Sequence, residues 1–435
     1  MRILLINRML SLVRGGGETF DLEIGRHLAA MDCRVDYLAG LPLLGGVRTG
    51  LAAENLAPRR LHHVRTPWLG WFPWDRVRAG WRVRMADIRL FERAALRWLL
   101  REGAAYDVIQ LCELPGLVRD AKERGFPKPM VLRLTAPDYY DPFDGIRYAD
   151  AVVASGTTLA KLALGPRPDA VDVPNAVDTE FFAPRPSGFR RQHGLSDDDL
   201  VILLVARYQA VKDHAMLIRA FGRVLAQEPR AFLVLAGSGP LEQATRRQCR
   251  QEGAQDRTLF LGEVRHNDLP AVYAAADIKV ISSVYESYCF AALEAMAAGL
   301  PLVVTDTEWV PGLIGDAGSG FAGLRRDTCG MPDTGYTMRD ARSEDELGDF
   351  VPGSPYPEPR IPNLASRIAP GGLVVPIGDA DAMAAALLAL ARDPALRREL
   401  GAWNRRAVLA AAGWENSARK LRAVYERVAK NDDRV

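Results

Sequence analysis

The sequence has few cysteines and no long apolar run. Its five cysteines are scattered without a CxxC or Cys/His spacing, which favours buried reduced thiols over disulfides or a zinc site. They are Cys33, Cys112, Cys249, Cys289 and Cys329. No stretch reaches the roughly 18 apolar residues that a membrane span requires. The initial RILLIN also lacks the basic and apolar regions of a signal peptide. These absences predict a cytoplasmic protein.

The sequence also lacks an excess of charge of either sign. It contains 56 Lys and Arg against 54 Asp and Glu, a net charge of +2, so no global charge predicts a nucleic-acid partner. A hydrophobic content of 48% with 25% charged residues is typical of a soluble globular chain. At 435 residues the chain exceeds the roughly 250 to 300 residues of a single core, so two domains are expected.

Short aliphatic runs alternate with longer segments of helical period, which is the pattern of parallel sheets with crossover helices. The first half predicts strands near residues 2–7, 34–39, 107–111, 130–134, 151–154 and 171–173. The second half predicts them in LVILLVAR, AFLVLAG, TLFLGEV, ADIKVISS and LPLVVTD. The expected fold class is therefore α/β, with two doubly wound Rossmann-like domains.

Two stretches interrupt this alternation. Residues 174–199 are rich in Pro, Asp and Gly and suit a linker or hinge better than a packed element. Residues 322–369 include the Pro-rich VPGSPYPEPRIP and are predicted to be a surface insertion, either an acceptor or oligomer contact or a passive loop. We place the first domain at 1–180 and the second at 181–413. Ligands are expected in a cleft that both domains face, at the carboxyl ends of the strands.

The first candidate binding element is the glycine-rich turn RGGGETF, which follows the first strand. Gly15, Gly16 and Gly17 let backbone amides approach a ligand, and the next helix N-terminus favours an anion such as a diphosphate. The pattern matches neither GxGxxG nor a Walker loop. A tight turn between strand and helix explains it equally well.

The second candidate is VARYQAVKD, which places Arg207 and Lys212 just past the carboxyl end of a strand. Two cations at that edge suit a leaving nucleoside diphosphate, because they stabilise the charge that develops on its β-phosphate. Taken alone, the motif is also explained by two solvated surface cations.

The third candidate is SSVYESYCFAALEAMAAGLP, which carries Glu286 in a loop and Glu294 in a helix expected to begin near Phe290. Free amides in the first turn of that helix can hold an anion or sugar hydroxyls. The two carboxylates can bind hydroxyls of a sugar and a ribose. Acids that merely cap and decorate a helix are the alternative.

These motifs stand in one order with several others: GGGE, VPNAVDTEFF, VARYQAVKD, LVLAGSGPL, FLGEV, ESYCFAALEAMAAGLPLVVTD and GGLVVPIGD. The ensemble resembles the retaining GT-B glycosyltransferases of glycosyltransferase family four, which are related to sucrose synthase and bacterial glycogen synthase. The final GWENSARKLRAVYERV is similar to that family's C-terminal helix, which crosses back onto the first domain, and predicts a helix over about 414–435. The resemblance is strongest from residue 173 to 306.

The resemblance implies transfer of a sugar from a nucleoside-diphosphate sugar to a hydroxyl acceptor, with retention at the anomeric carbon. It implies no metal and no cofactor. Arg207 and Lys212 would form a diphosphate clamp, and Glu286 would be the acid that faces the donor sugar. The main chain of Val264 would contact the base, and the segment Ser287, Tyr288, Cys289 and Phe290 would contact sugar or phosphate, mainly through backbone amides. The Glu294 carboxylate would hold the ribose.

The chain departs from the family pattern at two places. Many relatives carry a His after the fourth strand of the first domain, where this chain reads LRLTAPDYYD. Asp138 at this point takes a polar role near the acceptor or simply caps a turn. Cys289 stands where the family usually has Gly. Two alternatives therefore stay open, a nucleotide-sugar epimerase of GT-B shape and a non-catalytic sugar-nucleotide-binding homologue.

An aromatic and arginine-rich segment is the last feature. Tryptophans and arginines gather between Trp68 and Trp81, a composition that suits an acceptor, the surface of a membrane or plain loop packing. The segment therefore raises the hypothesis of a peripheral membrane contact. From Arg84 to Arg101 the apolar residues recur at helical spacing, which predicts a core-facing helix with a solvated basic face.

Overall fold

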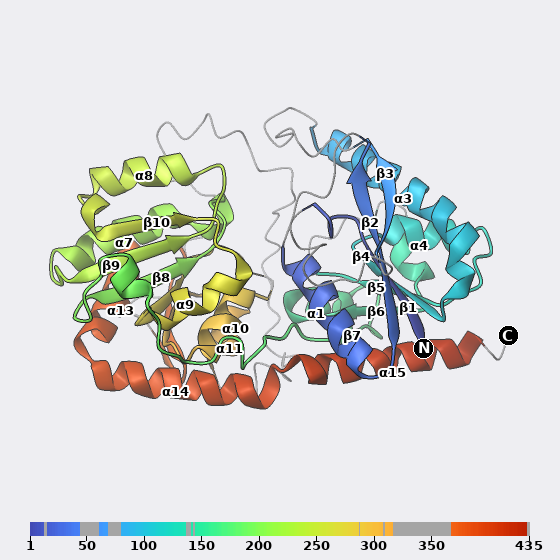
Figure 1. Cartoon of the computed structure of the whole chain (residues 1–435). Coiled ribbons are helices and arrows are strands. Elements are labelled where there is room, and N and C mark those ends of the chain that lie inside the picture. The colour runs from blue at the N-terminus through green and yellow to red at the C-terminus, as the bar shows by residue number, and fades with distance from the viewer. Residues whose placement is uncertain are drawn as a thin grey trace. The chain divides into compact units, whose positions relative to one another are not determined.

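The structure is a computed structural model that describes residues 1–12, 15–43, 61–67, 80–135, 141, 144–286, 288–307, 309–315 and 367–432. The described residues form two compact units. Unit 1 comprises the segments up to Pro174 and from Trp414 onward, and unit 2 comprises those from Asn175 to Gly413. Figure 1 labels the helices and strands of both units.

Unit 1 contains a seven-stranded sheet in the order β3-β2-β1-β4-β5-β6-β7. Every pair of neighbouring strands is parallel, and Arg2 opposite Arg34 sets the register of the first pair. The six strands predicted for the first half all form. Only β3 was not predicted. It is an edge strand, and its polar residues interrupt the apolar pattern by which a strand is recognised in the sequence. The bounds are β1 (Arg2–Asn7), β2 (Arg34–Pro42), β3 (Leu61–Thr66), β4 (Val108–Cys112), β5 (Met130–Arg133), β6 (Ala151–Ala154) and β7 (Val171–Asp172).

Helices cover both faces of this sheet. The predicted core-facing helix is α3 (Gly80–Glu102), which buries Phe91, Ala95 and Leu99 in one apolar cluster with α4 (Pro115–Lys122). On α1 (Gly16–Ala30), Phe20 meets the ring of Trp414 at 5.6 Å between centroids. Trp414 opens α15 (Trp414–Asp432), so the C-terminal helix packs on this unit as predicted (Figure 1). The smaller elements are α5 (Gly156–Leu164), η3 (Gly103–Ala105) and η4 (Gly145–Tyr148).

Unit 2 also contains a seven-stranded sheet, in the order β10-β9-β8-β11-β12-β14-β13, and its last two strands are exchanged relative to the order in unit 1. All neighbours are parallel except the edge strand β13, which runs antiparallel to β14. The predicted α/β class with two doubly wound sheets is therefore confirmed. The bounds are β8 (Leu200–Val205), β9 (Ala231–Ala236), β10 (Thr258–Gly262), β11 (Ile278–Ile281), β12 (Leu302–Thr305), β13 (Arg367–Ala369) and β14 (Gly372–Val375).

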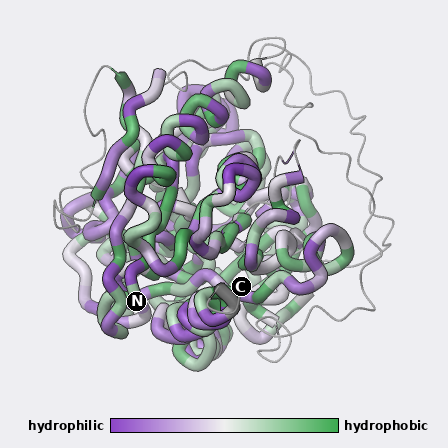
Figure 2. The backbone as a smooth tube through the Cα atoms, turned by 90° about the vertical axis from the view of Figure 1, so that its right-hand side faces the viewer, coloured by the Kyte–Doolittle hydropathy of each residue, from purple (hydrophilic) through white to green (hydrophobic). Residues whose placement is uncertain are grey.

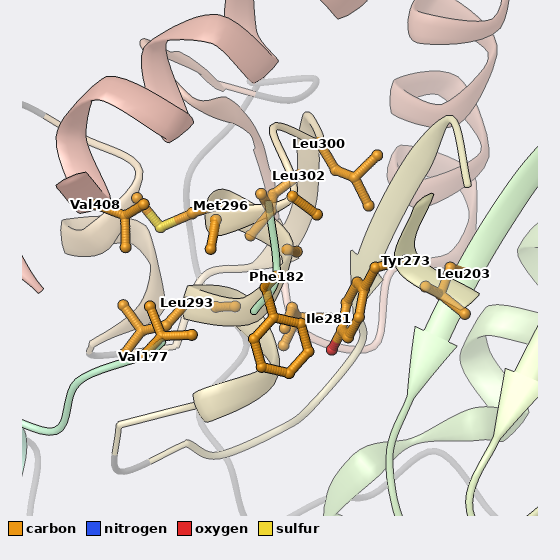
Figure 3. Close-up of a cluster of buried hydrophobic side chains, with 14 of the residues drawn as sticks. Val177, Phe182, Leu203, Tyr273, Ile281, Leu293, Met296, Leu300, Leu302 and Val408 are labelled. Carbon is orange, nitrogen blue, oxygen red and sulfur yellow. The ribbon is translucent and has the colours of Figure 1, made fainter. Parts of the chain in front are cut away.

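Two apolar layers sandwich the sheet of unit 2. One layer contains α7 (His214–Leu225) and α13 (Ala380–Arg392), and the other contains α9 (Leu269–Ala274), α10 (Phe290–Ala297) and α14 (Pro394–Ala411). Figure 3 shows side chains of the second layer, in which Met296 lies near Val408 and Leu293 lies near Val177. In Figure 2 helical turns alternate between hydrophilic and hydrophobic colour, as expected for helices with one buried face. The remaining elements are α6 (Phe189–Gln192), α8 (Glu242–Gln251), α11 (Val310–Leu313), η5 (Ala210–Lys212), η6 (Gln255–Arg257) and η7 (His266–Asp268).

The expectation that residues 174–199 form a linker rather than a packed element is wrong. Val177, Phe182 and Leu195 are buried in the core of unit 2. Arg190 of α6 anchors the segment through a 2.7 Å ion pair with Asp277. The turn residues keep the backbone of this segment irregular. The apolar side chains between them are nevertheless buried, and burial of apolar surface is what packs a segment against the core.

The predicted C-terminal boundary of the surface insertion, residue 369, is wrong. Arg367–Ala369 form the edge strand β13, whose Ile368 pairs with Leu373 of β14. The strand is only three residues long, too short for its pattern to be recognised from the sequence. The rest of the predicted insertion lies outside the described residues.

Candidate functional site

The sheet of unit 2 changes its direction of growth between β8 and β11, which are neighbours although two strands separate them in the chain. At such a switch point the loops beyond the carboxyl ends of the strands leave room for a ligand. Two hydrogen bonds to backbone carbonyl groups tie these loops together. The amide of Val284 donates to Val211 O at 2.9 Å, and Ser282 Oγ donates to Lys212 O at 2.7 Å.

Lys212 and Glu286 meet at this switch point. Lys212 ends η5, and its Nζ lies 2.7 Å from Glu286 Oε1, which also accepts a 2.7 Å hydrogen bond from Ser283 Oγ. The side chain of Lys212 is 23% exposed and that of Glu286 is 10% exposed. Burial acts to lower the pKa of Lys212, but the Glu286 carboxylate outweighs it, and the pKa is raised. The structure thus joins two predicted site residues in one charged pair that solvent still reaches.

Arg207 lies two residues beyond β8 and is exposed, and among the described residues its guanidinium forms no ion pair. Its loop packs against the Gly-Ser-Gly turn after β9. A Cβ at Gly237, where φ is +146°, would lie 1.9 Å from Ala206 O, and one at Gly239 would lie 2.6 Å from Tyr208 O. Only glycine allows this approach of the two backbones. These glycines position Arg207, and the sequence analysis did not assign them to the site.

The first turn of α10 follows the Glu286 loop. Cys289 is its N-cap residue and has φ +36°, a left-handed conformation that is costly for a residue with a side chain. Burial raises the pKa of the Cys289 thiol to about 12, so the thiol stays neutral. Tyr288 is buried beside Trp309 at 5.3 Å between ring centroids, and Phe290 begins the helix as predicted. Ser287 lies outside the described residues.

Glu294, one turn into α10, is held by a tyrosine from α9. Tyr273 OH donates to Glu294 Oε2 at 2.7 Å. Burial raises the pKa of Tyr273 well above its ordinary value, and the Glu294 carboxylate adds to the effect. Tyr273 therefore remains a hydrogen-bond donor and fixes the orientation of the carboxylate.

Lys279 is a charged residue near this site that the sequence analysis did not single out. It stands in the middle of β11 and is fully buried, and its Nζ donates to Val280 O at 2.7 Å. Burial lowers its pKa to about 8, while Cys289, Glu294 and Glu286 act in the opposite direction. A lysine inside the apolar run IKVI was the signal that could have revealed it, since lysine is almost never fully buried without a partner.

Val264 follows β10 and lines a cavity of about 770 Å³ between α6 and the start of α9. Leu261 and Val272 contribute apolar walls, and Asn267 contributes a polar group. The structure gives Val264 no hydrogen bond or ion pair with Lys212, Glu286 or Glu294 among the described contacts. Its predicted role at the base therefore stays a prediction.

In unit 1, the predicted glycine-rich turn is capped from within its own helix. Glu18 Oε2 accepts a 2.9 Å hydrogen bond from the Gly15 amide, which satisfies one free donor at the start of α1. Gly16 and Gly17 are the first two residues of that helix. Asp138 lies outside the described residues, as does the Trp68–Trp81 segment apart from the backbone of its last two residues.

A buried polar network, which was not predicted, lies beneath this turn. Asp21 Oδ2 accepts from Asn7 Nδ2 at 2.8 Å, and Arg133 Nη1 lies 3.9 Å from Asp21 Oδ1. Arg133 also stacks its guanidinium 3.6 Å above the centroid of the Phe20 ring. Burial raises the pKa of Asp21 to about 6, although Arg133 and Asn7 oppose the change. Tyr425 of α15 extends the network with a 2.7 Å hydrogen bond to Gln110.

No described helix is both long and apolar enough to span a bilayer. Within the same residues, no group of three or more His, Cys, Asp or Glu is placed to hold a metal ion.

One protein-family model matches the region of the chain that contains the candidate site of unit 2. Residues 188–325 match the family model of glycosyl transferases group 1. They include Arg207, Lys212, Glu286 and Glu294. The candidate site of unit 2 therefore lies within a region that is similar to this family.

Curated relatives match part of the chain. An uncharacterized glycosyltransferase of Methanocaldococcus jannaschii is 44% identical over 117 residues, 27% of this chain and 30% of that protein. The D-inositol 3-phosphate glycosyltransferase 2 of Catenulispora acidiphila is 31% identical over 239 residues, 51% of this chain and 55% of that protein. The chain thus spans less than two thirds of the length of these relatives.

Solved structures of other proteins have a similar fold. Sucrose-phosphate synthase of Thermosynechococcus elongatus gives a TM-score of 0.70 at 20% identity, covering 98% of each chain. HepE of Anabaena in complex with UDP gives 0.68 at 16% identity, covering 98% of this chain and 100% of that one. The predicted GT-B fold is confirmed by this likeness, together with the two parallel-dominated sheets.

Proposed function

We propose that this protein is a retaining glycosyltransferase that moves a sugar from a nucleoside-diphosphate sugar to a hydroxyl acceptor. The ion pair between Lys212 and Glu286, at the switch point of unit 2, is the observation that carries the proposal. The pair lies inside the glycosyltransferase group 1 match. Structures of HepE, which shares the fold, contain UDP and UDP-glucose and support a nucleotide-sugar donor.

In the proposed reaction, the bond between the anomeric carbon and the β-phosphate oxygen breaks as the acceptor oxygen attacks from the same face. The acceptor proton passes to the departing phosphate. Lys212 and Arg207 stabilise the negative charge that grows on this phosphate, and preorganised charge of this kind lowers the barrier directly. Two cations are thus proposed to do this without a metal or a cofactor.

The carboxylates are proposed to hold the donor. Glu286, fixed by Lys212 and Ser283, faces hydroxyls of the transferred sugar, and Glu294, oriented by Tyr273, holds the ribose. The first-turn amides of α10, from Cys289 onward, offer donors to the phosphate or sugar. Val264 is proposed to contact the base through its main chain.

Donor binding is tested by thermal unfolding of the full chain with UDP-, GDP- and ADP-sugars. A donor at about 100 times its dissociation constant stabilises the folded state by about 2.7 kcal/mol, which a melting scan detects. The expected result is stabilisation by one base class and its loss in Glu286→Ala. If all three donors leave the melting temperature unchanged, the donor site is wrongly assigned.

Turnover is tested with the donor that stabilises the protein and a panel of hydroxyl acceptors. We expect release of free nucleoside diphosphate and a glycosylated product whose anomeric configuration, read by NMR, equals that of the donor. An inverted product would contradict retention. Epimerised donor without a transferred sugar would indicate an epimerase, and binding without any turnover would indicate a non-catalytic homologue.

A further inference from the structure

Unit 1 contains a second cavity, in a groove between α3 and α4, whose lining is dominated by arginine. Its volume is about 450 Å³, and two leucines, Leu96 and Leu100, supply its apolar surface. None of these residues was assigned to the donor or the acceptor. The arginines that line the cavity are Arg89, Arg93, Arg97, Arg119 and Arg124.

Two of the five arginines are already paired with carboxylates. Arg89 lies 2.6 Å from Glu92 Oε2 and 2.9 Å from Asp120 Oδ2. Arg119 lies 2.9 Å from the other oxygen of Asp120 and 3.6 Å from Glu123 Oε1. Both oxygens of Asp120 therefore contact these two arginines, and among the described residues Asp120 forms no ion pair with the other three.

Arg93 and Arg97 are left with uncompensated charge. They stand one turn apart on the exposed side of α3, and neither forms an ion pair with any residue that the structure describes. Like charges at this spacing destabilise a helix, so the arrangement has a cost that an anion would relieve. Across the groove, Arg124 Nη1 donates to the backbone Asp120 O at 3.0 Å, which holds a third guanidinium at the cavity.

We propose that this groove binds the phosphate group of an anionic ligand through Arg93, Arg97 and Arg124. A guanidinium offers a planar fork of donors that matches two phosphate oxygens at once. The five arginines that line the cavity outnumber its two carboxylates, Asp120 and Glu123, and a phosphate carries the additional negative charge.

The apolar part of the groove indicates that the phosphate belongs to an organic ester. Leu96 is buried in the core beside the arginines, whereas Leu100 is 49% exposed. An exposed leucine at the cavity offers contact to the carbon skeleton of the ligand. Both a soluble phosphate ester and the headgroup of a phospholipid meet this description.

The experiment compares Arg97→Gln with Arg101→Gln in the full-length protein. The two arginines stand one turn apart on α3 and each change removes one charge, but only Arg97 lines the cavity. One arm measures calorimetric binding of glycerol 3-phosphate at low salt. The other measures co-sedimentation with vesicles of phosphatidylglycerol in phosphatidylcholine, against phosphatidylcholine alone.

We expect binding to weaken about tenfold in Arg97→Gln and in Arg93→Gln, as for the loss of one charge-assisted contact. Arg101→Gln should bind like the wild type. Arg97→Lys, which keeps the charge but loses the fork, should also bind more weakly than the wild type. Because Arg93 and Arg97 are exposed, a melting scan should show that all variants fold.

Each outcome decides the proposal. The expected pattern in the first arm identifies a soluble phosphate ester, and the same pattern only with phosphatidylglycerol vesicles identifies a lipid headgroup. Equal losses in Arg97→Gln and Arg101→Gln would reveal a general effect of charge and overturn the proposal. Absence of binding in both arms would also overturn it.

Discussion

The sheets of unit 1 and unit 2 share the same topology over their first five strands, but the charged residues near their switch points differ in solvent exposure. In unit 2 the charged pair Lys212 and Glu286 is partly open to solvent. In unit 1 the corresponding charges, Asp21 and Arg133, have exposed fractions of 1% and 6%. The same topology therefore supports one site that a ligand can reach and one closed network.

This difference shows that the chemistry resides in particular side chains rather than in the sheet. The pair in unit 2 is partly accessible to solvent, so the proposed donor can reach it. The closed network is shielded by Phe20 and α15, so its charges can only stabilise each other. Three substitutions test this contrast.

The largest effect is expected from Lys212→Met in unit 2. Removing a preorganised positive charge from the departing phosphate should lower kcat/KM for the donor about 100- to 1,000-fold, measured as release of nucleoside diphosphate. Arg247→Gln, an exposed change on α8, serves as the control and should leave turnover unchanged. Wild-type turnover in the Lys212→Met variant would contradict the proposed catalytic role of the charged pair in unit 2.

A smaller effect, on stability alone, is expected from Arg133→Met in unit 1. The substitution leaves the buried Asp21 carboxylate without its cation and should lower the free energy of unfolding by about 3 kcal/mol, measured by urea denaturation. The double variant Asp21→Asn with Arg133→Met removes both charges and should recover most of the loss. Loss of donor binding in a folded Arg133→Met protein would mean that the network is more than structural.

The smallest effect is expected from Lys279→Met, which removes a buried charge from unit 2. The pKa of Lys279 is about 8 in the fold against an ordinary value of 10.5, so the unfolded chain holds the proton more tightly. Burying the ammonium therefore costs stability below pH 8. That cost disappears as the pH rises from 8 to 10.5.

Lys279→Met should thus exceed the wild type in free energy of unfolding by about 2 kcal/mol at pH 7. The advantage should shrink as the pH rises through 8 toward 10.5, which denaturation at a series of pH values measures. An advantage independent of pH would contradict the titration of Lys279. A less stable variant would show that its attraction to Glu286 and Glu294 outweighs burial.

Much of the fold follows from local patterns in the sequence. Aliphatic runs such as LVILLV and RILLIN are buried on both faces in a parallel sheet, so their strands were predictable. The start of α10 at Phe290 was predictable as well. Strand β3 was not, because His62, His63 and Arg65 interrupt its apolar pattern at an edge. Segment 174–199 was misjudged because turn residues outnumber the few apolar anchors.

The site was predictable only in part. The resemblance to a known family identified Arg207, Lys212, Glu286 and Glu294 as candidate site residues. It did not predict any contact between them. It did not indicate that Lys212 and Glu286, 74 residues apart, form one pair, or that Tyr273 orients Glu294. Such contacts depend on which strands are neighbours, and no local pattern specifies that.

The sequence by itself determined the α/β class, the two sheets and the residue types available for chemistry, because helical and strand periods and strand-end motifs are local properties. Tertiary structure alone decided which charged side chains are accessible to solvent and which are buried. It paired Lys212 with Glu286 in reach of water, enclosed Asp21 with Arg133, buried Lys279 and brought five arginines around one groove. The physical reason is that solvent exposure and the distance between charges are set by packing between segments far apart in the chain.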